Sequence, residues 1–303
     1  MIKVTDVVKN QNIRDMKTKS IYALSKEKHI QDFLKNNHLD ASIMEDNWVE
    51  FLDYNDDYHL CEGCPSLASC RKDTPGMKKN LVYRDGRIDL EMECCAYGKS
   101  LEERRDLLEK FVITNMNEDI LLTDLSTLNI VQGKTGLTAN GQKTLIQLLN
   151  YVKNPTDQGF FLHGAMGCGK TTLLAALMNA LAKRGKEIGF VHFPTYLLDL
   201  KASFSTGSSD YAMEKLMKVD YLLLDGIGEE NVTTWSRDEI LLSIVSYRLL
   251  NHLPTFFTSM YDYKDLKKVY TIKKGDEIRA NTLISKLKAL SIEIMLDDSQ
   301  SKI

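Results

Sequence analysis

The sequence predicts an α/β fold in which a parallel sheet flanked by helices is preceded by a small helical, cysteine-rich domain. Three observations predict this arrangement. After about residue 136, apolar strand-like runs alternate with amphipathic helical segments, a pattern typical of a parallel sheet covered on both faces. A glycine-rich loop over 164–171 joins one such strand to a helix. Five of the six cysteines fall between Cys61 and Cys95, which indicates a differently built amino-terminal half.

Composition narrows the class of protein. A chain of 303 residues is long enough for two modest domains, and 43% hydrophobic with 27% charged residues is typical of a globular protein. The net charge of -3 excludes a globally basic nucleic-acid binder, although a local basic groove stays possible. We find no signal peptide and no apolar run of the roughly 20 residues that a membrane helix needs. We therefore expect a cytoplasmic protein without a membrane partner, in which clustered cysteines more often hold a metal than form disulfides.

The first domain is expected over residues 1–99. Apolar residues at helical spacing predict a helix within 21–39 and a second, shorter helix around 48–52. Two short strands, 81–83 and 88–92, flank a likely turn and predict a hairpin. Such a hairpin beside the cysteines suits a small metal-binding knuckle.

A helix and linker are expected over residues 100–135. Ser100 and Glu103 match a capping box, which predicts a helix that continues to residue 113. The rest of this segment is polar and irregular, so we interpret it as the linker. Residues 136–303 then form the second domain.

The second domain is predicted to alternate between helices and strands. The predicted helices cover residues 141–153, 170–184, 196–204 and 237–250. The predicted strands cover residues 159–163, 188–193, 219–224 and 255–259. Because helices separate the strands, the strands can run parallel in one sheet.

The glycine-rich loop matches G-x-x-x-x-G-K-[ST] at every fixed position and lies between a strand and a helix, as this motif requires. Its glycines allow backbone N–H groups to point at phosphate oxygens, next to a helix N-terminus. Lys170 is expected to neutralise the β- and γ-phosphates, and Thr171 to offer its hydroxyl to Mg²⁺. The expected ATP-contacting residues are Gly164, Ala165, Met166, Gly167, Cys168, Gly169, Lys170, Thr171 and Thr172.

A second acidic strand follows the loop by about fifty residues. The apolar run 219–224 ends in Asp225, which is expected to hold Mg²⁺ through water and so to act with the nucleotide. The alternative is a buried strand whose final aspartate only caps the next turn.

Four runs in the second domain carry a family resemblance. They are Asp225–Glu230, Thr234–Leu241, Tyr247–Arg248 and Leu253–Ser259. Together with the cysteine knuckle they resemble the DnaI-type primosomal helicase loaders, within the DnaC/DnaI/IstB-like AAA+ ATPase family. The resemblance implies an AAA+ P-loop ATPase that loads the replicative hexameric DNA helicase during replication initiation or restart. It also implies that the amino-terminal domain grips the helicase, while the AAA+ domain binds ATP and single-stranded DNA and can self-associate.

The chain departs from that family at several catalytic positions. The family has an acid, acting as general base, where Gly226 stands, and an asparagine sensor where Met260 stands. Two family arginines correspond to Thr282 and Lys286, and an arginine that reaches a γ-phosphate strongly accelerates hydrolysis. We therefore expect ATP hydrolysis that is weak or partner-dependent. The alternative is sequence drift with compensating residues nearby.

Other side chains could take over some of these roles. Glu229 and Glu230 follow Gly226 closely, and whether either reaches the γ-phosphate is left open. Arg237 and Arg248 are candidates for contacts across a subunit interface, and we count Arg237 with Lys170 and Asp225 as the expected catalytic residues. Two other functions stay open, a non-hydrolysing ATP-binding helicase adaptor and a transposition-helper ATPase. The cysteine knuckle argues against the second.

The cysteine cluster predicts a structural zinc site, because a C-x-x-C turn presents two thiolates to one ion and a distant pair can complete the tetrahedron. The expected ligands are Cys61, Cys64, Cys70 and either Cys94 or Cys95. The family resemblance implies a histidine ligand near Met77, whose place Cys70 would take. The alternative is a set of reduced, partly buried cysteines.

The carboxy-terminal region 264–288 is locally basic. Its lysines could follow a DNA backbone. Acidic residues are interspersed among them, which favours an ordinary solvated surface.

Overall fold

The computed structural model describes residues 15–128, 139–203 and 209–296. They belong to two compact units, one ending at Arg104 and the other beginning at Arg105. Part of the expected linker, 129–135, lies outside the described residues. None of the described helices is long and apolar enough to cross a membrane.

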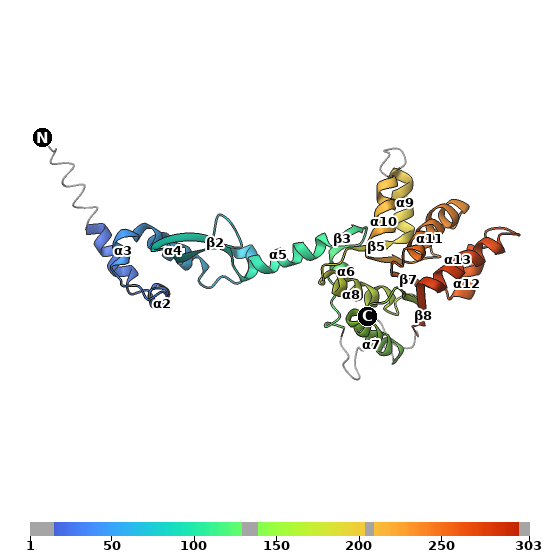
Figure 1. Ribbon diagram of the computed structural model, residues 1–303, viewed down its shortest axis with the longest axis horizontal. Coiled ribbons are helices and arrows are strands. Elements are labelled where there is room, and N and C mark those ends of the chain that lie inside the picture. Colours follow the sequence, from blue (N-terminus) through green and yellow to red (C-terminus); the bar gives the residue numbers. More distant parts are fainter. Residues whose placement is uncertain (1–14, 129–138, 204–208, 297–303) are drawn as a thin grey trace. The chain divides into compact units, whose positions relative to one another are not determined.

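The first unit is built from short helices and one antiparallel hairpin (Figure 1). Residues 15–24 are helical, and the elements that follow are α2 (Lys28–Asn36), α3 (Ile43–Asp46), α4 (Trp48–Cys61), a 3₁₀ turn η1 (Leu67–Ser69), β1 (Met77–Arg84) and β2 (Arg87–Cys94). The hairpin turns at Asp85 and Gly86, which both have positive φ as a tight Asp-Gly turn requires. Its apolar face packs with the helices around Phe51, Leu81 and Ile88, which are at most 5% exposed.

The second unit contains one six-stranded sheet in the order β3-β5-β6-β7-β4-β8. The strands are β3 (Phe111–Thr114), β4 (Gly159–His163), β5 (Ile188–His192), β6 (Tyr221–Asp225), β7 (Thr255–Ser259) and β8 (Ser291–Met295). Every neighbouring pair is parallel. The observed sheet, flanked by helices, confirms the α/β class that the alternating pattern predicts.

Two layers of helices cover the faces of this sheet (Figure 1). One layer contains α6 (Glu118–Leu121), α7 (Ala139–Lys153) and α8 (Lys170–Ala182). The other contains α9 (Phe193–Ser203), α10 (Ser209–Lys218), the π-helical segment η2 (Trp235–Leu241), α11 (Leu242–Leu250), α12 (Tyr263–Tyr270) and α13 (Glu277–Leu290). Successive strand residues alternate between the layers, so that Phe256 packs with one and Phe257 with the other. Burial on both faces explains why β4, β5 and β6 are mainly apolar along their length.

The segment predicted as the end of a helix and an irregular linker differs in the structure. Helix α5 covers Ala96–Glu109, and the next residues form β3, which pairs with β5. The run Phe111–Thr114 continues the helical spacing of the preceding apolar residues, but its β-branched side chains suit an edge strand. Phe111 and Leu121 are buried in the core of the second unit. This part of the expected linker is therefore structural.

Candidate active site

Three neighbouring strands bring the predicted phosphate-binding groups together. Strand β7 pairs with both β4 and β6, so the carboxyl ends of all three lie at one edge of the sheet. The phosphate loop follows β4, and Asp225 is the last residue of β6. The edge at the carboxyl ends of parallel strands is where α/β proteins bind their ligands.

The phosphate loop needs glycine for two separate reasons. A Cβ at Gly164 would lie 2.3 Å from the carbonyl oxygen of Leu296, so no side chain fits there. Gly169 has a φ of +91° and directly precedes α8, whose first residue is Lys170. The N–H groups at the start of α8 therefore face the loop, where their dipole favours a bound anion.

Lys170 lies inside the curl of the loop. Its Nζ donates to the carbonyl oxygens of Gly164 at 2.8 Å and Ala165 at 2.7 Å, and the residue is 8% exposed. The Cys168 thiol is buried 3.8 Å from the same nitrogen, whereas Met166 is 85% exposed. At the variable positions of the motif, the loop therefore offers backbone groups rather than side chains to a nucleotide. Lys170 supplies the positive charge.

Asp225 is held by two hydroxyl groups from neighbouring elements. Thr171 Oγ1 and Thr258 Oγ1 each donate to Asp225 Oδ1 at 2.7 Å. A threonine hydroxyl and a carboxylate side by side are oxygen donors of the kind that Mg²⁺ prefers, so these residues fit the expected ion. Thr258 was missed in the sequence, where nothing distinguishes it from the other polar residues of its strand, Thr255 and Ser259.

The chain carries no acid directly after Asp225, and the structure limits which neighbour could replace one. The carboxylate of Glu230 accepts the Gly228 N–H at 2.7 Å and the Tyr270 hydroxyl at 2.8 Å, and burial raises the pKa of Glu230. This side chain is therefore fixed inside the domain. Glu229 is exposed at the same edge of the sheet as Asp225.

The end of β7 lacks the polar sensor of the resembling family. Met260 directly follows the strand and is 45% exposed. A thioether is only a weak hydrogen-bond acceptor and donates nothing, so it cannot orient a water molecule as an amide would.

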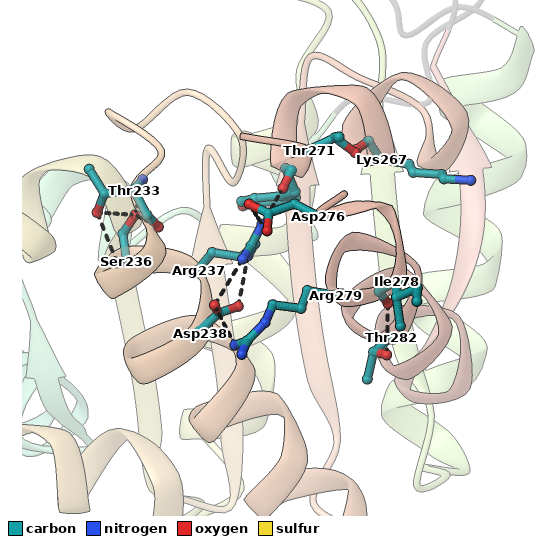
Figure 2. Close-up of polar contacts among 11 residues, drawn as sticks. Thr233, Ser236, Arg237, Asp238, Lys267, Thr271, Asp276, Ile278, Arg279 and Thr282 are labelled. Atoms are coloured by element: carbon teal, nitrogen blue, oxygen red, sulfur yellow. Dashed lines mark hydrogen bonds and ion pairs between the residues drawn. The ribbon is translucent and has the colours of Figure 1, made fainter. Parts of the chain in front are cut away.

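Arg237 is buried inside the second unit. Figure 2 shows its guanidinium between two aspartates. It forms a bidentate pair with Asp238, with contacts of 2.7 and 2.8 Å, and also contacts Asp276 at 3.2 Å and the Tyr270 carbonyl at 2.8 Å. Only 1% of the residue is exposed. We therefore correct the expected catalytic and interface role of Arg237, because this side chain ties η2 to the segment before α13.

Arg248 is buried in the same way. Its guanidinium donates to Thr255 Oγ1 at 2.8 Å and to several backbone carbonyls, including those of Val219 at 2.9 Å and Pro254 at 2.8 Å. Burial lowers the pKa of Arg248 to about 9, so the group stays charged at neutral pH. The expected contact across a subunit interface is thus also corrected, since Arg248 joins α11 to the starts of β6 and β7.

Two of the carboxy-terminal basic residues are paired with acids of the same unit. Lys268 contacts Asp265 at 2.7 Å, and Arg279 contacts Asp238 at 2.9 Å (Figure 2). These pairs support the interpretation of this region as an ordinary solvated surface.

The cysteines of the first unit do not converge on one point. Among the described residues, no group of three or more His, Cys, Asp or Glu side chains could hold a metal ion. The five cysteines predicted as ligands, all described, are Cys61, Cys64, Cys70, Cys94 and Cys95. Cys94 Sγ contacts Met77 Sδ at 3.6 Å and Glu102 Oε2 at 3.4 Å, whereas Cys95 Sγ accepts the Gly98 N–H at 3.4 Å. Consecutive residues at a strand end point in opposite directions, which explains this separation.

Two of the other cysteines have backbone partners of their own. Cys64 Sγ donates to the Ser66 carbonyl at 3.4 Å. The backbone N–H groups of Lys72 and Gly76 lower the pKa of the Cys70 thiol. The expected tetrahedral zinc site is therefore not assembled by the side chains that the structure describes.

Comparisons with known proteins agree with the resemblance found in the sequence. The model of the IstB-like ATP binding proteins matches residues 131–295. The replicative helicase loader DnaI of Bacillus subtilis (strain 168) is 26% identical over 277 residues, which are 90% of this chain and 88% of that protein. The crystal structure of DnaI has a TM-score of 0.54 at 29% identity, covering 61% of this chain and 97% of its own. The crystal structure of a putative primosome component from Streptococcus pyogenes serotype M3 has a TM-score of 0.52 at 28% identity. The match covers 63% of this chain and 94% of that chain.

Proposed function

We propose, from the premise that the chain belongs to the family of IstB-like ATP binding proteins, that it is an ATP-dependent loader of the replicative DNA helicase. The observation that carries this proposal is the similarity to the helicase loader DnaI over 90% of the chain. A match of that extent reaches well into the first unit, beyond the ATP-binding unit that many P-loop proteins share. The loader would act in the cytoplasm, at replication initiation or restart.

The nucleotide chemistry rests on four side chains of the second unit. Lys170 would bind the β- and γ-phosphates, while Thr171 and Asp225 would hold Mg²⁺, directly or through water. Bound Mg²⁺ neutralises phosphate charge and polarises the γ-phosphoryl group. Thr258 orients the carboxylate of Asp225 from the neighbouring strand. Hydrogen bonds hold both the Lys170 side chain and the Asp225 carboxylate at this edge of the sheet, which supports ATP binding there.

The first unit is proposed to contact the helicase ring. It exposes several large apolar side chains, namely Met16, Tyr22, Val49, Met92 and Leu101, each more than half exposed. Exposed apolar side chains of this size suit a protein partner. Binding of single-stranded DNA and self-association are proposed for the second unit. The zinc site stays a prediction, which metal analysis of the purified chain would test.

A second candidate function is a helicase adaptor that binds ATP without hydrolysing it. Gly226 and the exposed Met260 favour it, because neither can position or deprotonate a water molecule. The transposition-helper alternative is less favoured, since the similarity to DnaI extends into the first unit.

The proposal is tested by a loading assay with the purified full chain, a hexameric replicative helicase and circular single-stranded DNA. Helicase bound to the circle is measured with and without ATP. Loading should need ATP and should be lost in Lys170→Ala. Lys186→Ala is the matched control, because Lys186 is exposed before β5, at the opposite edge of the sheet. Loading that is equal without ATP, or no binding to the helicase, would contradict the proposal.

A further inference from the structure

We propose that Glu229 is the general base of ATP hydrolysis, a role that Gly226 cannot fill because it has no side chain. The catalytic carboxylate would then come from the end of the turn that follows β6 rather than from the residue directly after Asp225. This inference rests on the proposed ATP-dependent function and names one residue of the same site. The evidence is the backbone path from Asp225 to Glu230 and the groups around Gly226.

A tight turn carries Glu229 back to the end of β6. The Glu229 N–H donates to the Gly226 carbonyl at 3.2 Å, and Gly226 and Gly228 have φ values of +78° and +86°. Both values lie in the left-handed region that favours glycine. The chain therefore reverses directly after Asp225, and the side chain three residues beyond Gly226 returns beside it.

The turn is anchored on both sides. The Gly226 N–H donates to Thr258 Oγ1 at 2.8 Å, and the Ile227 N–H donates to the Thr258 carbonyl at 3.0 Å. Ser259 Oγ donates to the Ile227 carbonyl at 2.7 Å, and the buried Glu230 carboxylate accepts the Gly228 N–H. Four hydrogen bonds thus fix the backbone that presents Glu229, which limits the reorganisation needed before catalysis.

The carboxylate of Glu229 lies as close to position 226 as the carboxylate of an acid at that position would. A Cβ built on Gly226 would be 3.5 Å from Glu229 Oε2. By standard bond lengths, a glutamate at position 226 would hold its carboxylate oxygens roughly 3–3.7 Å from that Cβ. Position 226 directly follows Asp225, the proposed Mg²⁺-binding residue.

His192 lies beside the same point. Its Nε2 would be 3.3 Å from the Cβ built on Gly226, and β5 aligns it with Asp225. Its Nδ1 contacts Thr195 Oγ1 at 2.8 Å, and its backbone exchanges hydrogen bonds with the Asn115 side chain. The imidazole of His192 therefore borders the space that a side chain at position 226 would occupy.

The reaction step is an ordinary hydrolysis. Water attacks the γ-phosphorus while its proton passes to the Glu229 carboxylate. The bond between that phosphorus and the β–γ bridging oxygen breaks, and ADP leaves with the electron pair. Because Glu229 is exposed, it can return the proton to solvent. Glu230 cannot take this part, since its two oxygens are engaged inside the domain.

The test compares ATP affinity with single-turnover hydrolysis in the full chain, alone and with the helicase and single-stranded DNA. Glu229→Gln should lower the hydrolysis rate at least 10-fold, as expected for loss of a general base, while ATP affinity changes less than about twofold. Glu229→Asp should retain part of the rate. Glu239→Gln is the matched control, because Glu239 is an exposed acid on η2 and should leave both quantities unchanged. Thermal unfolding of each variant checks that it is folded.

The outcomes separate this inference from the proposed function. If Glu229→Gln hydrolyses ATP at the wild-type rate, Glu229 is not the base. If the wild-type chain binds ATP but hydrolyses none in any mixture, the inference also fails, while the ATP-binding adaptor function stands. If the wild-type chain binds no ATP, the proposed function itself fails.

Discussion

The hydroxyl of Thr258 donates to Asp225 Oδ1 over 2.7 Å and links β7 to the last residue of β6. The same Thr258 oxygen accepts the Gly226 N–H at 2.8 Å. One buried hydroxyl thus orients the proposed Mg²⁺-binding carboxylate and also anchors the turn that carries Glu229.

This double contact predicts that Thr258→Val weakens Mg²⁺-dependent ATP binding. Loss of a group that orients a metal-binding carboxylate commonly costs 10–100-fold in metal affinity, so we expect ATP affinity in Mg²⁺ to fall about tenfold. Titration calorimetry with and without Mg²⁺ measures the effect. Thr258→Ser retains the hydroxyl and is the matched control. Equal weakening in the absence of Mg²⁺ would argue against a role through Asp225.

The buried position of Arg237 predicts a structural role. Arg237→Met leaves Asp238 and Asp276 without their main cationic partner, and removing one member of a buried pair costs about 3–5 kcal/mol. We expect a fall of about 3 kcal/mol in the free energy of unfolding, measured in urea. Arg279→Met removes the exposed partner of the same Asp238 and should cost less than about 1 kcal/mol. An Arg237 variant of unchanged stability that loses only assembly-dependent hydrolysis would restore the interface role.

Some parts of this site can be predicted from the sequence, for identifiable reasons. Lys170, Thr171 and Asp225 belong to local patterns, in which neighbouring residues and the flanking strand and helix define the role. Thr258 could not be found in this way, because its role depends on strand order. Glu229 was named among the acids near Gly226, but its reach was left open because it depends on a turn closed by two glycines. Arg237 and Arg248 were misplaced because an arginine usually lies at a surface, and only tertiary contacts show that carboxylates and carbonyls surround them.

The ion pair of Asp124 and Lys183 predicts a pH-dependent contribution to stability. The Lys183 ammonium and the N–H and hydroxyl groups of Ser126 lower the pKa of Asp124 from 3.8 to about 2. Because the folded pKa is depressed, the stabilisation is present above about pH 4 and is lost as the pH falls towards 2. Both side chains are partly exposed, so Asp124→Asn should cost about 1 kcal/mol at pH 7. Urea unfolding of the wild-type chain and of Asp124→Asn at pH 7 and at pH 2 measures this stability cost. A cost at pH 2 as large as that at pH 7 would contradict the prediction.

Glu230 predicts a pH dependence of the opposite sign. Burial raises the pKa of Glu230 above its ordinary value of 4.5, so the folded chain holds this proton more tightly than the unfolded chain. The free energy of unfolding should therefore fall as the pH rises from 4.5 towards the folded pKa, by at most about 1.4 kcal/mol per pH unit. Glu230→Gln should remove this slope, because glutamine still accepts the Gly228 N–H and can donate to the Tyr270 hydroxyl. Urea unfolding between pH 4.5 and 8 measures the slope for the wild-type chain, for Glu230→Gln and for the control Glu239→Gln. Glu239 is an exposed acid, so its replacement should leave the slope intact. If Glu230→Gln keeps the wild-type slope, a group other than Glu230 must bind the proton.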